Sequence, residues 1–413
     1  MRRRVAVSGI GTISALGDGP GATIEAALAG RSGIARLDAP FADRLLGPAA
    51  AAVPGFDGAG LLEPARLRML DRSARLALHS ANGALADAHD PLADLDPARA
   101  GVFLGTGMGG TLSMDAGYET LYGEGSDRIN PFTVLMGMHN AAAAWVAMAH
   151  GLAGPQLTYS TACSSSTVAI GEAWRRVAAG ELELALAGGT EAPLSCGSMK
   201  AWEALRTLAR ADADDPGASC RPFSADRTGM VLGEGAAVLV LEPMERALAR
   251  GAAVRGEILG YGTTSDTGHV TRPSVAGQVA ALRAALESAA LDPDAVGAIN
   301  AHGTGTVAND RTETAAIREA LGARAERVPV SATKSMHGHL LGAAGALEAA
   351  LALLAMERRA APPTMHLRAP DPECDLDYAA NAAREGVEAE VTLSSSFAFG
   401  GSNAVLALGR AGA

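Results

Sequence analysis

Apolar runs along the chain end abruptly at small or polar residues and then give way to a helical pattern. The β-branched and aromatic run at residues 157–161 stops just before Cys163, and the pattern becomes helical from Ser164 onward, through Val168 and Trp174. This change predicts a strand that leads directly into a helix. Cys163 is therefore expected at the N-terminus of that helix.

The same arrangement recurs twice nearer the C-terminus. Residues 296–300 have the pattern of a buried strand, and a Gly/Thr loop that contains His302 follows them. In α/β proteins, loops at the C-terminal ends of strands form the ligand sites. A short strand at Val330 is followed by a polar turn and then by an apolar helix, whose buried stripe is marked by Leu347, Leu351 and Leu354.

A faint internal repeat indicates two similar halves that join near residues 250–255. The matching segments are residues 102–107 with 298–303, the turn at Cys163 with the turn at His339, and residues 237–241 with 404–408. Strands that alternate with helices predict mixed α/β layers.

Composition and charge narrow the class of protein. The chain has 413 residues, of which 48% are hydrophobic, so it is long enough for a large core and two domains. The net charge of −11 argues against nucleic-acid binding. No apolar run reaches the roughly 18 residues that span a membrane, and the N-terminal arginines precede too short an apolar segment for a signal peptide. Four irregularly spaced cysteines are typical of a reducing cytosol, so a cytoplasmic location is expected.

Cys163 is the first candidate for chemistry. At a helix N-terminus the free N–H groups and the helix dipole favour the reactive thiolate. The same N–H groups can bind an oxyanion on an acyl group that the sulfur attacks. Most lone cysteines are buried small hydrophobic residues, however, so a catalytic role requires partners.

His302, Lys334 and His339 are the candidate partners. His302 precedes a Gly/Thr loop that core packing explains poorly, because glycines let a ligand approach the backbone and threonine hydroxyls can bind amides. Lys334 and His339 lie in the polar turn after Val330. A metal site is not expected, because no Cys or His pair shows ligand spacing near an acidic third ligand.

These residues and four further motifs resemble the β-ketoacyl-acyl-carrier-protein synthases, specifically the synthase II type and its type II polyketide relatives. The motifs are residues 5–11, 105–110, 221–235 and 396–403, so the resemblance covers nearly the whole chain. It implies an α/β thiolase fold of two similar βαβ-rich halves, packed as a five-layered α-β-α-β-α sandwich. Residues 1–251 would carry the nucleophile, and residues 252–413 would carry the two histidines.

The resemblance also implies a reaction. Cys163 would take an acyl chain from a carrier protein, and His302 and His339 would promote loss of carbon dioxide from malonyl-acyl carrier protein by stabilising the enolate oxygen. Phe399 would act as a gate and, with Cys163, supply the N–H groups of an oxyanion hole. No cofactor is implied beyond the phosphopantetheine arm of the carrier protein. The implied supporting network consists of Lys334, Asp310, Glu313 and Glu348.

Substrate and partner contacts follow from the same resemblance. The implied substrate-binding residues are Met108, Trp202, His269, Thr271, Thr304, Thr306 and Gly400. The candidates for docking the acidic carrier protein are Arg66, Arg68 and Arg206, whose local positive charge would overcome the negative net charge. The relatives are dimers, so a homodimer and a heterodimer with a chain-length-factor-like subunit both fit.

Several positions depart from the family pattern. Trp202 is bulkier than the expected phenylalanine, which predicts a reshaped acyl pocket, and ordinary core packing is the alternative. The other departures are Thr228, Met230, Asn309 and His337. The Asn309-Asp310 pair, Thr228, Met230 and Trp202 favour specialised polyketide synthesis over general fatty acid synthesis.

Two other functions stay open. They are a non-elongating acyltransferase that uses the same cysteine, and a silent partner subunit.

Overall fold

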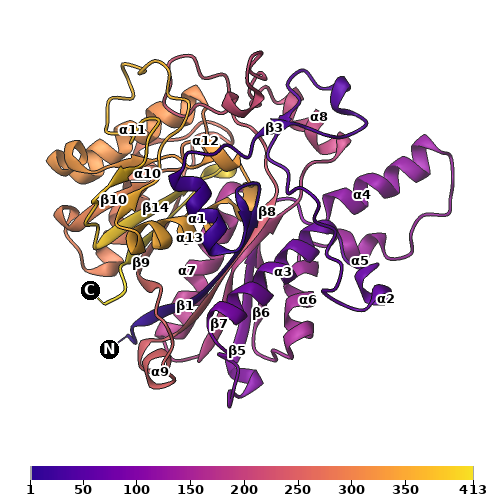
Figure 1. The fold of residues 1–413 in the computed structure, drawn as a ribbon, viewed down its shortest axis with the longest axis horizontal. Coiled ribbons are helices and arrows are strands. Elements are labelled where there is room, and N and C mark those ends of the chain that lie inside the picture. The colour runs from indigo at the N-terminus through magenta and orange to yellow at the C-terminus, as the bar shows by residue number, and fades with distance from the viewer. Residues whose placement is uncertain (1, 413) are drawn as a thin grey trace.

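The computed structural model describes residues 2–412 and shows two halves with the same strand order (Figure 1). In the first half the order is β6 (Gln156–Tyr159), β5 (Ala100–Gly105), β7 (Leu184–Glu191), β8 (Gly235–Pro243) and β1 (Val5–Ser14). In the second half it is β11 (Val330–Ser331), β10 (Val296–Asn300), β14 (Val391–Phe397), β15 (Ser402–Gly409) and β9 (Gly256–Ser265).

Strand direction repeats as well. In the first half β5 is parallel to β6 and β7, whereas β8 is antiparallel to β7 and β1. In the second half β10 is parallel to β11 and β14, whereas β15 is antiparallel to β14 and β9. The fold is therefore duplicated, and β1 and β9 join the two five-stranded blocks through a short antiparallel contact. The boundary between residues 251 and 252 stays a prediction.

Helices form the other three layers of the thiolase-type sandwich. On the outer face of the first block lie α3 (Arg72–Asp87) and α6 (Ala141–His150), and α10 (Val275–Ala289) and α11 (Val307–Leu321) cover the second block. Between the blocks lie α7 (Ser165–Ala178) and α13 (Ala344–Glu357), each of which contacts strands of both halves.

The central helix α13 is nearly all apolar because both of its sides are covered, whereas α7 keeps Glu172, Arg175 and Arg176 at positions that are not buried. Every residue of α13 is buried except Glu357, and Glu348 is the single charge among the buried ones. A helix that is apolar all round belongs in the core of a protein. The two helices approach closely at Gly345, where a Cβ would lie 1.9 Å from Thr167 Oγ1.

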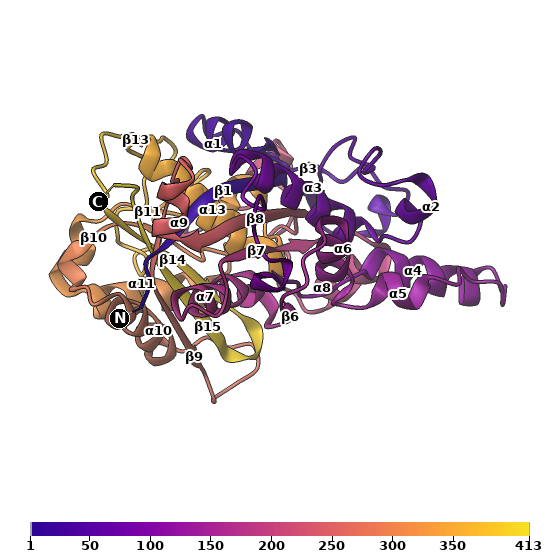
Figure 2. The ribbon, with the colours of Figure 1, turned by 90° about the horizontal axis from the view of Figure 1, so that it is seen from below.

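Shorter elements surround this core. The helices are α1 (Pro20–Leu28), α2 (Pro64–Leu67), α4 (Thr111–Tyr118), α5 (Thr133–Gly137), α8 (Cys196–Ala204), α9 (Met244–Ala249) and α12 (Lys334–His337). The short strands are β2 (Gly17–Asp18), β3 (Ala35–Arg36), β4 (Ala49–Ala50), β12 (Ala360–Ala361) and β13 (Arg384–Glu385). The segment from α4 to α5 extends away from the body of the molecule (Figure 2). Within residues 2–412, no helix has the length and apolar character needed to cross a membrane.

Candidate active site

Cys163 lies in the turn between β6 and α7, one residue after a left-handed Ala162 with φ of 50°. Ser165 fixes this turn because its hydroxyl donates to the carbonyl of Ala162 (2.6 Å) and accepts the N–H of Thr161 (2.9 Å). A non-glycine residue in this conformation costs about 1–2 kcal/mol. The turn therefore stores strain directly before Cys163. This residue is 6% exposed to solvent.

His339 brings an imidazole from the second half to that sulfur. Its Nε2 lies 3.0 Å from Cys163 Sγ, and its Nδ1 accepts the backbone N–H of Leu341 (3.2 Å). Because Nδ1 is an acceptor, the ring proton of the neutral imidazole belongs on Nε2. His339 therefore presents an N–H donor to the space beside the sulfur.

His302, in the loop after β10, has the same tautomer for a different reason. The ammonium group of Lys334 lies 3.3 Å from His302 Nδ1 and donates to the His302 carbonyl at 2.6 Å. A lysine ammonium is only a donor, so Nδ1 accepts and the ring proton lies on Nε2. The two imidazoles meet edge to face, with centroids 5.4 Å apart.

Both rings are neutral. Burial lowers the pKa of His302 and His339 well below the ordinary value, and the charge of Lys334 lowers both further. The site thus combines a sulfur with two neutral N–H donors. The positive charge of the site is on Lys334, behind the two imidazoles. Preorganised N–H donors of this kind can stabilise an oxyanion where its charge develops.

The thiol differs from the sequence-based expectation of a favoured thiolate. Burial raises the pKa of Cys163 to about 12, although Lys334 and the backbone N–H of Phe399 act in the opposite direction. Desolvation penalises the charged form more strongly than these two groups stabilise it. The resting site therefore holds a thiol.

Lys334 is fully buried and forms an ion pair with the fully buried Glu348 of α13. Burial raises the pKa of the Glu348 carboxyl to about 7, and Lys334 lowers it in opposition. The lysine therefore links α12, the loop at His302 and the central helix α13.

Two carboxylates of α11 hold the backbone of the loop at His302. Glu313 accepts the N–H groups of His302 (2.6 Å) and Gly303 (2.8 Å). Asp310 accepts those of Phe223 (2.9 Å) and Gly305 (3.3 Å). These bonds fix the loop from behind, because α11 begins immediately after it.

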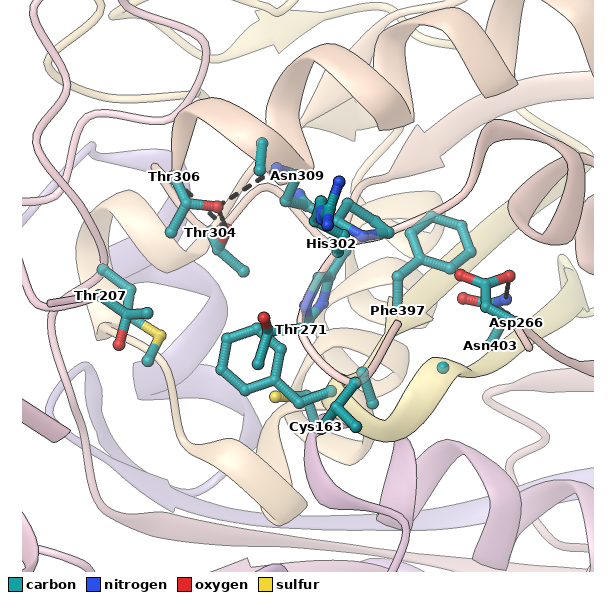
Figure 3. A pocket seen from close by; sticks show the side chains of 18 of the residues that line it. Cys163, Thr207, Asp266, Thr271, His302, Thr304, Thr306, Asn309, Phe397 and Asn403 are labelled. Carbon is teal, nitrogen blue, oxygen red and sulfur yellow. Dashed lines mark hydrogen bonds between the residues drawn. The ribbon is translucent and has the colours of Figure 1, made fainter. Parts of the chain in front are cut away.

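An open cavity leads to the sulfur and both imidazoles (Figure 3). Thr304 and Thr306 lie along it, with their hydroxyls 2.9 Å apart, and Thr271 lies on its wall. All three side chains offer hydrogen-bonding groups along the approach to the sulfur. A slender polar chain therefore finds partners along the whole route.

A second, apolar region adjoins the sulfur, and one of its members, Met230, also lines the open cavity. Cys163 belongs to a hydrophobic cluster that includes Met199 and Met230, with Met108 and Trp202 packed against it. Trp202 stacks on Phe399, with ring centroids 6.1 Å apart. Neither Met108 nor Trp202 lines the open cavity, so this region is filled by side chains.

Other sequence-based candidates lie farther out. His269 is exposed and accepts the N–H of Thr271 (3.1 Å), and neither it nor the exposed Gly400 lines the cavity. His337 is buried behind the site and contacts Thr333. Arg206 is exposed between two residues that line the cavity, Leu205 and Thr207.

The other two docking candidates come from a different part of the fold. Arg66 and Arg68 are exposed on and just after α2, and α2 and α8 lie apart in both views (Figures 1 and 2).

Sequence reasoning missed several residues of the site. Arg272, Asp266 and Asn403 line the cavity, and Asn403 donates to Asp266 at 3.0 Å. Glu191 ends the buried strand β7 and accepts N–H groups from both halves. An acidic residue at the C-terminal end of an otherwise apolar strand was the available signal for Glu191.

Cys163, His302 and His339 also offer three ligand atoms that lie within 4.8 Å of one another. A sulfur and two imidazoles are suitable ligands for a soft metal ion. The buried ammonium group of Lys334, which contacts His302 Nδ1, opposes a second cation at this position. The arrangement suits an oxyanion better than a metal ion.

A duplicated thiolase fold, with a cysteine at the N-terminus of one central helix and two neutral imidazole donors facing it, defines a thioester-dependent acyltransferase. Two family models match the chain. They are Beta-ketoacyl synthase, N-terminal domain, over residues 2–247, and Beta-ketoacyl synthase, C-terminal domain, over residues 255–368. The chain belongs to the β-ketoacyl synthase family.

Individual relatives agree over the full length. The chain is 40% identical to Nodulation protein E of Rhizobium meliloti (strain 1021), covering 98% of this chain and 99% of that one. It is 39% identical to 3-oxoacyl-[acyl-carrier-protein] synthase 2 of Synechocystis sp., covering 98% of each. A solved structure described as the ishigamide ketosynthase/chain length factor superposes with a TM-score of 0.94 at 34% identity, covering 100% of both chains.

Proposed function

We propose that this protein condenses a Cys163-bound acyl chain with malonyl-acyl carrier protein and releases a β-ketoacyl-acyl carrier protein. The observation that carries the proposal is the meeting of Cys163 Sγ with two Nε2–H imidazoles at the end of one cavity. Relatives named 3-oxoacyl-[acyl-carrier-protein] synthase 2 support this choice of reaction.

In the first step the sulfur of Cys163 replaces the sulfur of the carrier's thioester. The new bond joins Sγ to the acyl carbon, the old C–S bond breaks, and the thiol proton ends on the released carrier thiol. The N–H groups of Cys163 and Phe399 bind the tetrahedral oxyanion. Lys334 supports this step because its charge favours the thiolate.

In the second step a malonyl thioester occupies the cavity with its carbonyl oxygen between His302 and His339. The carboxylate leaves as carbon dioxide, and its bond electrons form an enolate that the two N–H donors stabilise. The enolate carbon attacks the acyl carbonyl, the Sγ–C bond breaks, and the cysteine thiolate takes up one proton. The reaction needs no cofactor, since loss of carbon dioxide supplies the carbanion.

The open cavity suits the phosphopantetheine arm that carries both substrates. Thr304, Thr306 and Thr271 provide hydroxyls for its amides, and Arg206 flanks the opening where an acidic carrier protein would dock. The acyl chain would enter the apolar cluster beyond the sulfur by displacing Phe399 from Trp202.

The experiment combines intact-protein mass spectrometry with labelled malonyl-acyl carrier protein. Acyl groups should load onto the wild type, the Cys163→Ala variant should not load, and labelled carbon dioxide should appear with the β-ketoacyl product. His302→Ala and His339→Ala should keep loading but lose carbon dioxide release. Loading without any carbon dioxide from the wild type would instead support a non-elongating acyltransferase.

We also propose a dimer in which a second ketosynthase-fold chain covers β6. Within residues 2–412, strand β6 pairs only with β5 and so exposes an edge. The segment from α4 to α6 exposes apolar surface at Tyr122, Val134 and Met148. Exposed edges and apolar patches of this kind mark interfaces. Native mass spectrometry with and without a chain-length-factor-like subunit distinguishes a homodimer from a heterodimer.

Placement in specialised polyketide synthesis and in the cytoplasm completes the proposal. The first is supported by the full-length similarity to the ishigamide ketosynthase/chain length factor. The second is supported by four free cysteines within the described chain, since disulfides are rare in a reducing compartment. A product analysis with several carrier proteins tests the pathway.

A further inference from the structure

Glu191 is a fully buried carboxylate that binds both halves of the molecule at the base of the active site. It ends β7 in the first half. Its oxygens accept the N–H groups of Gly107 (2.6 Å), Met108 (3.0 Å) and Gly342 (2.9 Å) and the hydroxyl of Thr106 (3.0 Å). Gly342 lies in the second half, three residues after His339.

Each of these four partners of Glu191 is a donor. Three are backbone N–H groups, and the Thr106 hydroxyl already accepts the N–H of Gly109 (3.1 Å), which leaves its hydrogen for Glu191. Burial raises the pKa of the Glu191 carboxyl to about 7, and the four donors lower it in opposition. A proton on Glu191 would find no acceptor among them. The ionised Glu191 side chain accepts all four hydrogen bonds. Hydrogen bonds to a charged acceptor are stronger than hydrogen bonds between neutral groups.

The bond to Gly342 bears on His339 through Leu341, the residue directly before Gly342. Leu341 has a left-handed conformation with φ of 46°, which is strained for a leucine. Its N–H donates to His339 Nδ1 and so determines which ring nitrogen carries the proton. Glu191 holds the peptide group directly after this strained residue.

We propose that Glu191 is a positioning residue for His339: by anchoring Gly342 it holds the strained turn whose Leu341 N–H keeps the His339 proton on Nε2. The inference rests on the proposed function, because an Nε2–H donor at His339 matters for stabilising the enolate. Without the anchor the turn relaxes, the Leu341 N–H leaves Nδ1, and the imidazole divides between its two tautomers.

The test compares Glu191→Gln with Glu242→Gln. Glu242 is an equally buried carboxylate on β8, and it pairs with Arg246 and Arg250 at the opposite end of the sheet. The control therefore reproduces the loss of a buried charge without touching the site. In Glu191→Gln the NH₂ group of the new side-chain amide would also face backbone N–H donors, and two donors cannot hydrogen-bond to each other. The anchor at Gly342 is therefore lost rather than weakened.

Two readouts separate positioning from a merely structural role. Ring ¹⁵N NMR with histidine labelling, assigned by His339→Ala, reports the tautomer directly and needs no substrate. Carbon dioxide release is compared with acyl loading of Cys163. For Glu191→Gln we expect an Nδ1–H signal from His339 and a roughly 10- to 100-fold loss of carbon dioxide release, a fraction of the roughly 10²–10³-fold effect of removing one oxyanion donor.

The Glu242→Gln protein should keep the wild-type tautomer of His339 and the wild-type ratio of carbon dioxide release to acyl loading. A wild-type His339 with its proton on Nδ1, or an Nε2–H signal that persists in Glu191→Gln, would overturn the proposal. If Glu191→Gln does not fold, Glu191→Asp keeps the charge but shortens its reach, and the same shift of tautomer is expected. If the wild-type protein releases no carbon dioxide, the proposed function is wrong. The measurement of the His339 tautomer then still tests the role of Glu191, because it needs no substrate.

Discussion

Replacing Lys334 with methionine removes the ammonium group and nearly keeps the volume of the side chain. In the structure that group contacts three acceptors: Glu348, the His302 carbonyl and His302 Nδ1. All of these groups are buried, so water does not replace the lost donor. The substitution therefore affects two properties through different contacts: the stability of the fold through Glu348, and the chemistry through His302.

The stability effect comes from Glu348. Breaking a buried ion pair by removing one partner costs about 3–5 kcal/mol, because the other charge remains desolvated. The pKa of Glu348 is already raised to about 7 by burial, and Lys334 is the group that lowers it in opposition. In Lys334→Met the carboxyl should therefore be protonated at neutral pH, which limits the loss to the lower part of this range.

The chemical effect comes from His302. Without a donor at Nδ1, the ring loses the contact that keeps its proton on Nε2, and one of the two enolate donors is compromised. Removing one such donor reduces the rate by roughly 10²–10³-fold, or about 3–4 kcal/mol. Acyl loading should also slow, because Lys334 lowers the pKa of the Cys163 thiol.

The double variant Lys334→Met/Glu348→Gln separates the two effects. Replacing the unpaired carboxyl group with an amide removes the cost of protonating it and should restore part of the lost unfolding free energy, as measured by urea denaturation. Carbon dioxide release from malonyl-acyl carrier protein should stay at the low rate of the single variant. Recovery of both stability and carbon dioxide release would refute the assignment, because Lys334 would then act only as a counter-charge.

Three further outcomes are expected. Burial raises the pKa of Glu313 from 4.5 to about 7, so between these values the folded state binds a proton that the unfolded chain lacks, and stability falls as pH rises. Glu313→Gln should flatten that slope in urea denaturation, and an unchanged slope would contradict it. Trp202→Phe should open space beside Phe399 and extend the range of acyl chains that load, as read by mass spectrometry. Arg272→Glu, at the exposed rim of the cavity, should raise KM for carrier-bound substrate roughly 10-fold or more and leave small thioester substrates unaffected.

The local structure around each candidate could be predicted from the sequence because it depends on neighbouring residues. The stop of an apolar run before Cys163 predicts a strand that leads into a helix, and β6 and α7 have this arrangement. The repeat between residues 102–107 and 298–303 corresponds to β5 and β10, which occupy equivalent positions in the two halves.

The convergence of the site could not be predicted from local patterns. Cys163, His302 and His339 lie on different elements, and their meeting depends on how the two halves pack, so it entered only through the family resemblance. The burial that raises the thiol pKa, and the four donors around Glu191, are likewise products of tertiary packing. A helix N-terminus alone suggested the opposite charge state for the sulfur.

The duplication explains why the sulfur and an imidazole face each other. In each half a turn precedes the central helix and begins with a left-handed non-glycine residue, Ala162 before α7 and Leu341 before α13. The first turn presents Cys163, and the second holds His339 through the Leu341 N–H. Because the two central helices pack against each other, their N-terminal turns come together. One strained turn therefore supplies the nucleophile and its counterpart supplies a donor, and Glu191 is hydrogen-bonded to the second turn from the first half.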